Sequence, residues 1–518
     1  MSVAQPTSLT AKSRTTPSLV AGHAEARPDA AAILALERRP LTYGAFFEVV
    51  TRAAKQLRSF GIGRNERVAM VLPNGPEAVT AFVAVSSAAT CAPLNPAYRP
   101  DEFDFYLSDL NAKALIVARG SDSPAVEIAR RRGVMLIEMA AAEVAGDFEL
   151  AGPARASDQP VEDELAESSD IALVLHTSGT TSRPKIVPLT HANVTASARN
   201  ISRALALTPN DRCLNVMPPF HIHGLMAAVL ATLEAGASVV CTPGFDAMKF
   251  FAWLSEFKPT WYTAVPTMHQ AILARAARNP EAAAASRLRL IRSSSASLPP
   301  QVLAELERVF HAPVVESYGM SEAAHQMASN PLPPKARKPG SVGPAAGPEI
   351  RIMNDAGDLL EQGQTGEVVI RGENVTAGYE NNPEANRDAF TNGWFRTGDQ
   401  GFLDEDGYLR LTGRLKEIIN RGGEKISPRE VDEVLLDHPA VAQVVTFALP
   451  HEKLGEEVAA AIVLVGDQAP TARELREFAA QRLADFKVPR KFVFVEEIPK
   501  GPTGKLQRIG LAKILGLA

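Results

Sequence analysis

The chain has few cysteines, and their placement excludes several kinds of site. Its 518 residues contain three, Cys91, Cys213 and Cys241, and no two of them form a Cys-x-x-Cys pair. Scattered cysteines argue against a disulfide framework or a zinc site and are typical of a reducing compartment. We therefore expect a cytoplasmic protein without a disulfide framework.

Long apolar runs and a large excess of one charge are also missing. The most apolar stretch, residues 78–94, is broken by Ser86, Thr90 and Pro93, so it predicts a buried helix and turn and not a membrane span. The formal net charge is −5 without a long basic stretch, which argues against nucleic acid as the main partner. Residues 1–18 are polar and lack the apolar centre of a secretory signal, so we expect a disordered N-terminal arm. Nothing in the sequence indicates an obligate protein partner.

Short β-rich runs alternate with helical stretches rich in Ala, Leu and Glu. The runs include residues 68–72, 114–117, 288–291 and 314–315. This alternation predicts layered α/β structure with largely parallel sheets. Segment 139–169 is rich in Ala, Glu and Asp, and we expect a solvated connection there.

The sequence texture changes twice toward the C-terminus. Short alternating strands and Asp/Gly turns over about residues 343–412 predict a small, mainly antiparallel β module. Residues 427–430, Ser-Pro-Arg-Glu, have the pattern of a helix N-terminus. The expected fold class is α/β. A large N-terminal domain of layered sheets, residues 19–413, contains the β module, and a smaller, mobile α+β C-terminal domain covers residues 414–518.

One polar segment, residues 176–185, indicates a co-substrate. Its sequence is His-Thr-Ser-Gly-Thr-Thr-Ser-Arg-Pro-Lys. The segment follows an apolar run at 171–175 and precedes a helix start near Thr190. A strand, a Gly/Ser/Thr loop with a lysine and a helix can hold a polyphosphate, because N–H groups and hydroxyls donate to phosphate oxygens. The loop lacks the Walker pattern, so it predicts a nucleoside triphosphate site outside the kinase-type folds. The alternative, an ordinary polar surface loop, is disfavoured by five further segments.

These five segments carry a resemblance to a known superfamily. They are Pro219–Gly224 (Pro-Phe-His-Ile-His-Gly), Tyr318–Glu322 (Tyr-Gly-Met-Ser-Glu), Gly393–Asp399 (Gly-Trp-Phe-Arg-Thr-Gly-Asp), Gly413–Glu417 (Gly-Arg-Leu-Lys-Glu) and Pro502–Lys505 (Pro-Thr-Gly-Lys). With the phosphate loop they stand in the order found in acyl-adenylate-forming enzymes, and the chain resembles that superfamily over nearly its whole length. The superfamily includes acyl-CoA synthetases, 4-coumarate–CoA ligases, firefly luciferase and the adenylation domains of peptide synthetases.

The resemblance implies a two-step reaction with ATP, Mg²⁺ and coenzyme A. A carboxylate attacks the α-phosphorus of ATP to give acyl-AMP and pyrophosphate, and the CoA thiol then attacks the acyl-AMP. The first step brings anions together, so the site must supply positive charge and fixed N–H donors. Catalytic roles are implied for Thr180, His221 and Lys505, and Lys505 is expected to bridge the substrate carboxylate and the α-phosphate.

The resemblance also assigns binding roles. Glu322 is expected to hold Mg²⁺, Tyr318 to stack against adenine, and Asp399, at a Thr-Gly-Asp turn, to accept from the ribose hydroxyls. Lys416 matches the family's hinge, and Gly422 and Gly423 are expected to face the CoA tunnel. The implied nucleotide-binding set is Thr177, Ser178, Gly179, Thr180, Thr181, Lys185, Ser295, Ala296, Ser297, Glu316, Ser317, Tyr318, Gly319, Met320, Ser321, Asp399, Arg414 and Lys505.

The phosphate loop departs from the usual family pattern at two positions. Ser182 stands where glycine is common, and Ile186 stands where glycine usually follows the lysine. Neither change removes a donor, so both indicate a subfamily and not a loss of activity.

Positions that resemble the acyl-pocket wall of the CoA ligases are polar in this chain. A fatty chain would leave such groups unpaired, at a cost of about 1–3 kcal/mol each, whereas a second carboxylate would satisfy them. The implied substrate residues are His223, Arg292, Ser294, Ser295 and His325. The alternative is that His325 and Arg292 are satisfied structurally elsewhere.

The amino-acid sequence of three segments resembles the oxalate–CoA ligase branch. They are residues 261–270, 292–298 and 329–333. The resemblance implies conversion of oxalate, ATP and CoA to oxalyl-CoA, AMP and diphosphate. Three alternatives stay open: a CoA ligase for a short or medium-chain fatty acid or an aryl acid, a free-standing adenylation enzyme that loads a carrier protein, and a non-catalytic nucleotide-binding scaffold. The absence of an attached carrier domain disfavours the second, and the retained charged residues disfavour the third.

Overall fold

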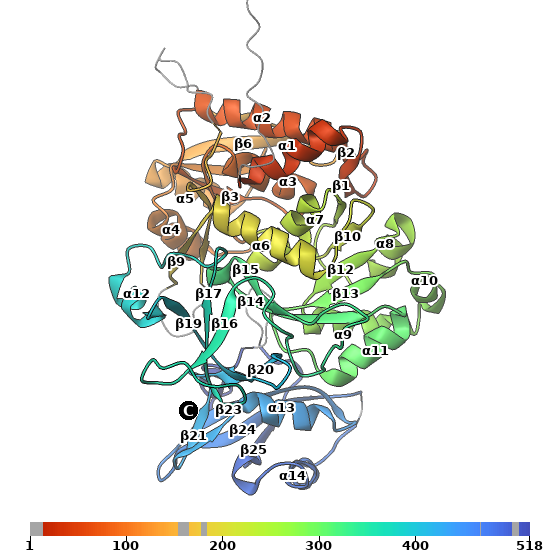
Figure 1. The fold of residues 1–518 in the computed structure, drawn as a ribbon, viewed down its shortest axis with the longest axis vertical. Coiled ribbons are helices and arrows are strands. Elements are labelled where there is room, and N and C mark those ends of the chain that lie inside the picture. Colours follow the sequence, from red (N-terminus) through yellow and green to blue (C-terminus); the bar gives the residue numbers. More distant parts are fainter. Residues whose placement is uncertain (1–13, 154–164, 178–183, 467, 500–506, 518) are drawn as a thin grey trace, which may run out of the picture.

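Four β-sheets organise the described part of the molecule, shown in Figure 1 as a computed structural model. The structure describes residues 14–153, 165–177, 184–466, 468–499 and 507–517. The two largest sheets and the helices around them occupy the upper part of the view, and the C-terminal sheet lies at the bottom. Within the described residues, no helix combines the length and the apolar character that crossing a bilayer requires.

An eight-stranded sheet carries most of the residues expected to bind substrate. Its interior strands pair in parallel, and each outer strand is antiparallel to its neighbour. In spatial order the strands are β15 (His325–Ser329), β14 (Val314–Met320), β13 (Leu290–Ser293), β12 (Trp261–Ala264), β10 (Arg212–Asn215), β11 (Ser238–Cys241), β1 (Ala31–Ala35) and β2 (Leu41–Thr42).

A seven-stranded sheet has the same plan, with parallel interior strands and antiparallel strands at both edges. In spatial order its strands are β7 (Phe148–Ala151), β6 (Met135–Ala141), β5 (Ala114–Ala118), β3 (Arg67–Val71), β4 (Thr90–Pro93), β8 (Ile171–His176) and β9 (Ile186–Thr190). The short apolar runs of the sequence form its central strands because both faces of a parallel sheet are covered by helices. The predicted layering of parallel sheets is confirmed.

Helices fill the space between the two large sheets and cover their outer faces. One core cluster joins strands of both sheets to α2 (Tyr43–Ser59), α3 (Pro76–Ser86), α6 (His191–Ala204), the π-helix η1 (His223–Leu230) and α7 (Ala231–Glu234). The outer face of the eight-stranded sheet packs against α8 (Phe250–Phe257), α9 (Pro266–Ala276), α10 (Pro280–Ala284) and α11 (Pro300–Phe310). The outer face of the other sheet packs against α4 (Pro100–Asp109) and α5 (Pro124–Arg132).

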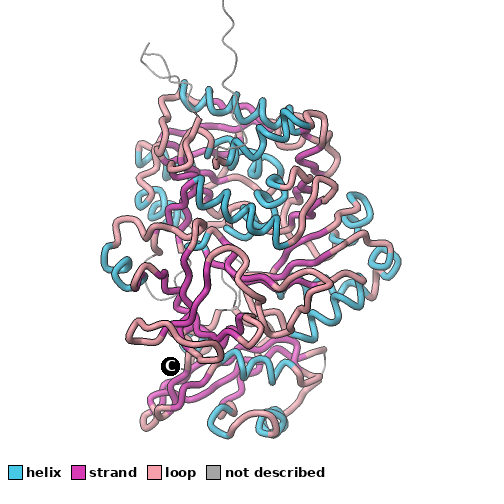
Figure 2. The backbone as a smooth tube through the Cα atoms, in the orientation of Figure 1, coloured by secondary structure: helices cyan, strands magenta, loops and turns pink. Residues whose placement is uncertain are grey.

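A small antiparallel sheet follows, in the region where the sequence predicts a β module. It consists of β16 (Glu349–Met353), β17 (Gly366–Arg371), β18 (Phe390–Thr391), β19 (Trp394–Leu403) and β20 (Leu409–Arg414), with α12 (Pro383–Ala389) between β17 and β18. Figure 2 shows its strands as the magenta segments in the centre of the lower half. The short 3-10 helix η2 (Ser321–Ala323), which precedes β15, lies against β9 of the seven-stranded sheet.

The C-terminal part of the chain has its own sheet and its own core. The strands are β21 (Ile419–Arg421), β22 (Glu424–Ile426), β23 (Val441–His451), β24 (Gly455–Leu464) and β25 (Lys491–Phe494). The helices are α13 (Pro428–Leu436), α14 (Ala472–Ala480), η3 (Asp485–Lys487) and α15 (Leu511–Ile514). Ser427 caps α13 by accepting from the Glu430 N–H at 3.3 Å, as the sequence predicts. Residues 415–418 separate this sheet from β20, and the boundary at residue 414 stays a prediction.

Two expectations about local structure are wrong, and a third is confirmed. Helix α1 (Thr16–Ala26) begins inside the expected disordered arm. Thr16 is buried, and its N–H donates to His191 Nδ1 at 3.1 Å. Residues 1–13 lie outside the described residues. The expected solvated connection at 139–169 contains paired strands, since β6 and β7 continue to residue 151. The expected helix start at Thr190 is confirmed, since Thr190 caps α6, and the strand β9 lies between Lys185 and this helix.

Candidate active site

Parallel strands bring the expected substrate and nucleotide residues to one edge of the eight-stranded sheet. In the register of β12, β13 and β14, Thr263 lies opposite Arg292, and Ser293 lies opposite Glu316. Loops that follow these strands therefore begin side by side, at the carboxyl ends where open α/β sheets bind ligands. The Ser294–Ser297 loop follows β13, and the Tyr318–Glu322 motif closes β14.

A buried polar cluster surrounds Arg292. The guanidinium has 0% exposure, and its Nη1 lies 3.4 Å from His223 Nε2, 3.3 Å from His325 Nε2 and 3.4 Å from Thr263 Oγ1. Its Nη2 donates to Gln326 Oε1 at 3.3 Å. The structure thus brings together three of the five residues expected to bind the acid.

The two histidines of this cluster have further partners. His223 Nδ1 lies 3.0 Å from Ser295 Oγ, and His223 Nε2 lies 2.6 Å from Thr263 Oγ1. The rings of His223 and His325 are 4.9 Å apart at their centroids. Ser294, the fifth expected acid-binding residue, instead donates to the Ser317 carbonyl at 2.9 Å. Ser294 therefore holds the backbone of β14, and its hydroxyl is engaged there.

Backbone geometry aims Ser295 and His325 at the cluster. Both have positive φ angles, 74° for Ser295 and 92° for His325, in a region that favours glycine. Such conformations cost about 1–3 kcal/mol each and concentrate at functional sites. Gly319 permits the turn at His325, because a Cβ on Gly319 would stand 1.9 Å from the His325 carbonyl oxygen. The strained backbone thus places His325 beside Arg292 and Ser295 beside His223.

Arg292 is a buried cation without a buried anion. In the ion pairs formed among the described residues, Arg292 has no carboxylate partner, and its Nε has no hydrogen-bond acceptor. Burial lowers the pKa of Arg292 to about 9, which is the direction expected for a cation held away from water. A buried charge without a counter-ion is costly, so the cluster is chemically suited to an anionic ligand.

A second group of side chains joins β14 to the small antiparallel sheet. The Tyr318 hydroxyl donates to Asp399 Oδ2, and Arg414 Nε lies 2.9 Å from Asp399 Oδ1. Asp399 raises the pKa of Arg414, and burial together with Asp399 raises that of Tyr318. Three of the expected nucleotide-binding residues are therefore in contact. Asp399 lies within the strand β19 and not at a turn, with Gly398 before it at a φ of 73°.

A third group lies where the phosphate loop ends. Lys185 Nζ stands 4.4 Å from the centroid of the Tyr379 ring, and the Tyr379 hydroxyl donates to Glu322 Oε1 at 2.8 Å. The loop's ends are paired, since the Thr177 N–H donates to the Lys185 carbonyl at 2.9 Å. Ser178, Gly179, Thr180, Thr181 and Ser182 lie outside the described residues, as does Lys505.

The surroundings of Glu322 are compatible with the expected Mg²⁺ role. Mg²⁺ retains several waters and is held by one or two carboxylates together with substrate phosphates. Among the described residues no group of three or more His, Cys, Asp or Glu side chains could hold a metal. A single buried carboxylate beside the phosphate loop is the donor set that a nucleotide-borne cation uses.

Other polar atoms beside the Tyr318 motif are buried without a protein partner. They are Ser297 Oγ and Glu316 Oε2, while Glu316 Oε1 accepts from the Leu298 N–H at 3.0 Å. Burial raises the pKa of Glu316 to about 7. Buried polar groups are normally paired, so these two atoms are exceptions among the described residues.

The remaining expected residues have local roles in the structure. His221 Nδ1 accepts from the His223 N–H at 3.3 Å, and Ser317 Oγ lies 3.1 Å from Ser329 Oγ. Gly422 and Gly423 form the two-residue turn between β21 and β22, with φ angles of 59° and 96°. The residues that complete the expected set are described too: Ala296 and Lys416 are exposed, and Met320 and Ser321 are half-buried.

Sequence reasoning missed Thr263, Gln326 and Tyr379. Thr263 lies in a segment that resembles a family branch, but its position beside Arg292 depends on strand register. Gln326 follows His325 directly, and its contact with Arg292 depends on the fold of β15. Tyr379 stands outside every motif, and nothing local in the sequence indicates that it meets Lys185.

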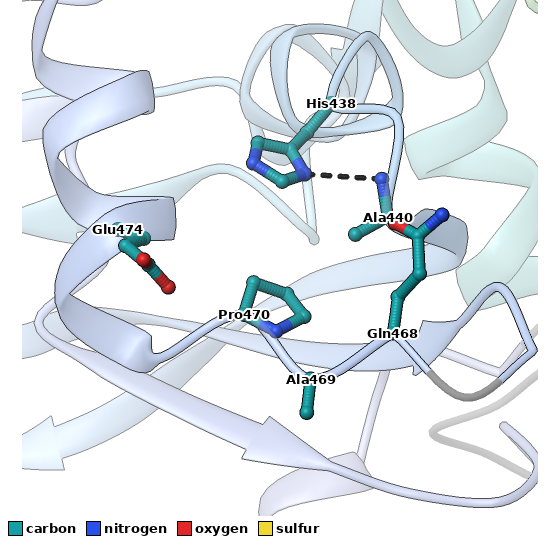
Figure 3. A pocket seen from close by; sticks show the side chains of 6 residues that line it. All are labelled: His438, Ala440, Gln468, Ala469, Pro470 and Glu474. Atoms are coloured by element: carbon teal, nitrogen blue, oxygen red, sulfur yellow. Dashed lines mark hydrogen bonds between the residues drawn. The ribbon is translucent and has the colours of Figure 1, made fainter.

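A shallow pocket in the C-terminal part does not belong to this site (Figure 3). Its polar groups already serve the local backbone, since His438 Nδ1 accepts from the Ala440 N–H at 3.2 Å. Glu474 accepts from the Thr471 N–H at 2.7 Å and so caps α14. Both side chains are therefore explained by folding, and none of the lining residues is an expected site residue.

The chain is similar to known proteins over most of its length. The family model described as AMP-binding enzyme matches residues 20–380, and the model of the AMP-binding enzyme C-terminal domain matches residues 430–505. An oxalate–CoA ligase of Arabidopsis thaliana is 46% identical over 93% of this chain and 95% of its own length. An oxalate–CoA ligase of Saccharomyces cerevisiae is 43% identical over 87% of each chain. ATP-bound MatB from Rhodopseudomonas palustris superposes with a TM-score of 0.86 at 28% identity, over 97% of this chain and 98% of its own.

Proposed function

The chain belongs to the AMP-binding enzyme family, and from that premise we propose that it is an ATP-dependent acid–CoA ligase whose acid is oxalate. The products are oxalyl-CoA, AMP and diphosphate, and coenzyme A and Mg²⁺ complete the set of reactants. The two oxalate–CoA ligases that resemble the chain over most of its length support this choice of acid.

The observation that carries the proposal is the buried cation at the end of β13. Arg292 is fully buried, has no carboxylate partner among the described residues and is surrounded by His223, His325 and Thr263. The distal carboxylate of oxalate supplies the missing anion, and charged hydrogen bonds between arginine and carboxylate are strong. A fatty or aryl acid would leave Arg292 buried and uncompensated, which disfavours those substrates.

In the first step, an oxygen of the reacting carboxylate bonds to the α-phosphorus of ATP. The bond from that phosphorus to the β-phosphate oxygen breaks, and diphosphate leaves. Arg292 and the histidines hold the distal carboxylate, so the reacting carboxylate is oriented by a rigid group and not by a flexible chain. Lys505 is assigned the contact with the reacting carboxylate and the α-phosphate, where its charge offsets the repulsion between the two anions.

The nucleotide is assigned to the side chains beside β14. Asp399 accepts from the ribose hydroxyls while Arg414 holds that carboxylate in place at 2.9 Å, and Tyr318 lies against the base. Lys185 and the phosphate loop hold the β- and γ-phosphates. Thr180 and His221 are assigned catalytic roles in the first step. When bound, Mg²⁺ neutralises phosphate charge, and Glu322 is the protein group that would hold it.

In the second step, the CoA thiol loses its proton, its sulfur bonds to the oxalyl carbon, and the bond from that carbon to the AMP oxygen breaks, so that AMP leaves. The C-terminal domain is assigned a rotation about Lys416 between the steps, which removes Lys505 and brings Gly422 and Gly423 to the CoA path. The exposure of Lys416, in a turn between β20 and β21, supports a hinge there. Three buried cysteines without a disulfide support a cytoplasmic location.

Diphosphate release by the purified chain tests the proposal. ATP, Mg²⁺ and CoA are supplied with oxalate, oxamate, malonate, acetate, octanoate or 4-coumarate in separate reactions, and oxalyl-CoA is identified by mass. Oxalate is expected to give the highest kcat/KM. A higher value for octanoate or 4-coumarate would retain the family reaction and reject the assignment of Arg292, His223 and His325 to the acid.

A further inference from the structure

A buried tyrosine stands between the two charged groups expected to meet the triphosphate and its cation. Tyr379 is 9% exposed and Glu322 is 7% exposed, and the phenol donates to Glu322 Oε1 at 2.8 Å. Lys185 lies over the face of the same ring, 4.4 Å from its centroid. One side chain therefore contacts a cation with its face and an anion with its hydroxyl.

Tyr379 is fixed independently of these two contacts. Its N–H donates to Asn386 Oδ1 at 2.7 Å, and Asn386 Nδ2 donates back to its carbonyl at 2.8 Å. The ring also packs edge-on against Phe395, with centroids 6.3 Å apart. The ring position is thus set by the small antiparallel sheet and α12, and not by Lys185 or Glu322.

The segment that carries Tyr379 is tied to both charged groups through the backbone. The Thr376 N–H donates to the Glu322 carbonyl at 2.7 Å, and the Glu380 N–H donates to the carbonyl of Ile186, the residue after Lys185, at 3.1 Å. Residues 376–380 therefore form a bracket between η2 and the start of β9. The bracket fixes the separation of the two elements that carry Lys185 and Glu322.

Lys185 and Glu322 carry opposite charges and contact the same tyrosine, yet they do not pair with each other. In the ion pairs formed among the described residues, neither side chain takes part. Among the described residues, the ammonium group of Lys185 contacts the ring face, through an interaction of about 0.5–2 kcal/mol that a phosphate can readily replace.

We propose that Tyr379 is a positioning residue that acts as a spacer in the triphosphate site. Its ring keeps Lys185 and Glu322 from forming a direct ion pair, so the lysine remains available to phosphate and the carboxylate to the phosphate-bound cation. This inference rests on the proposed use of ATP and does not depend on which acid is the substrate. Removing the ring lets the lysine and the glutamate neutralise each other, and MgATP must then break that pair to bind.

Two substitutions separate the spacer role from a simple hydrogen-bond role. Tyr379→Phe keeps the ring under Lys185 and removes only the hydroxyl, so MgATP affinity is expected to fall about threefold or less, the loss of one hydrogen bond. Tyr379→Ala removes the ring, and MgATP affinity is expected to fall about thirtyfold or more, because a partly buried ion pair must be broken. Affinity is measured by calorimetry on the full chain with MgATP and no acid, so that no reaction occurs.

A matched control is present in the same chain. Lys338 Nζ lies 4.5 Å from the centroid of the Tyr408 ring, and the Tyr408 hydroxyl donates to the Ala336 carbonyl at 2.7 Å. Tyr408→Phe therefore makes the same chemical change at a site that the nucleotide does not touch, and its MgATP affinity is expected to equal that of the wild type. Supplied acyl-AMP and CoA should give thioester at the wild-type rate in both Tyr379 variants, because the β- and γ-phosphates are absent from that step.

A crystal structure of Tyr379→Ala supplies a readout that is independent of affinity. The spacer role predicts Lys185 Nζ within ion-pair distance of the Glu322 carboxylate. Equal affinity losses in the Phe and Ala variants, or wild-type affinity in the Ala variant, would overturn the inference. If the Ala variant does not fold, a loss of about tenfold or more in Tyr379→Phe overturns it too, because the retained ring should suffice. Failure of the proposed function would instead show as absent turnover with every acid while MgATP still binds.

Discussion

Substitution of Arg292 by methionine should weaken oxalate binding without lowering the stability of the fold. The guanidinium is fully buried, and its contacts with His223, Thr263, His325 and Gln326 are all 3.3–3.4 Å long. Hydrogen bonds between nitrogen and oxygen are most often about 2.9–3.0 Å, so these contacts return little of the cost of burying a charge. Methionine has a similar length and no charge, so we expect the free energy of unfolding of Arg292→Met to stay within about 1 kcal/mol of wild type or to rise.

Oxalate should respond in the opposite way. Loss of the cation leaves the distal carboxylate buried without a partner, which costs about 3 kcal/mol or more and raises the KM for oxalate about a hundredfold or more. Urea unfolding gives the stability, and diphosphate release as a function of oxalate concentration gives the KM. A loss of several kcal/mol of stability with an unchanged KM would refute the reasoning, because Arg292 would then be a structural residue.

Arg289, three residues earlier, provides the control for this experiment. Its Nε lies 2.6 Å from Asp211 Oδ1 and its Nη2 lies 3.0 Å from Asp211 Oδ2, a carboxylate that is almost fully buried. Arg289→Met leaves the buried Asp211 carboxylate without its cation, so it should lose about 2 kcal/mol or more of stability while the KM for oxalate is unchanged. Arg292→Met is thus expected to raise the KM for oxalate without a loss of stability, and Arg289→Met to lower stability without a change in that KM.

Two further substitutions have signed outcomes. His325→Ala should raise the KM for oxalate about tenfold or more through loss of a buried polar contact, while the KM for ATP stays as it was; an unchanged oxalate KM would contradict the pocket assignment. The pKa of Glu316 is raised from 4.5 to about 7, so the folded state holds its proton more tightly than the unfolded state. Stability from this group is complete below about pH 4.5 and is lost as the pH rises toward about 7, up to about 2–3 kcal/mol. Glu316→Gln should remove that decline in urea unfolding at pH 5 and pH 8, and parallel curves for wild type and variant would exclude it.

Local signals in the sequence predicted the parts of the fold that depend on near neighbours. Ser427 and Glu430 predict the cap of α13, and Thr190 predicts the start of α6, because a cap involves residues three positions apart. The apolar runs predict the central strands for a similar reason, since a strand buried on both faces has few polar positions. The helix α1 was missed because its anchor is the distant His191.

The candidate site shows the same division between local and distant information. Arg292, His223 and His325 could be proposed from motif wording, but their mutual contacts depend on the register of β12, β13 and β14 and on the positive φ of His325. Tyr379 could not be proposed at all. It reaches Lys185 because the segment between β17 and α12 crosses to η2 and β9, and no local sequence pattern predicts that crossing.

The ratio of kcat/KM for oxalate and oxamate tests the central claim most directly. Oxamate has nearly the same shape as oxalate, but an uncharged amide replaces one carboxylate, so only the anion expected beside Arg292 is removed. We predict a preference for oxalate of about a hundredfold or more, as expected for a buried charge that loses its partner. Equal kcat/KM values for the two acids would contradict the assignment of Arg292 to the distal carboxylate.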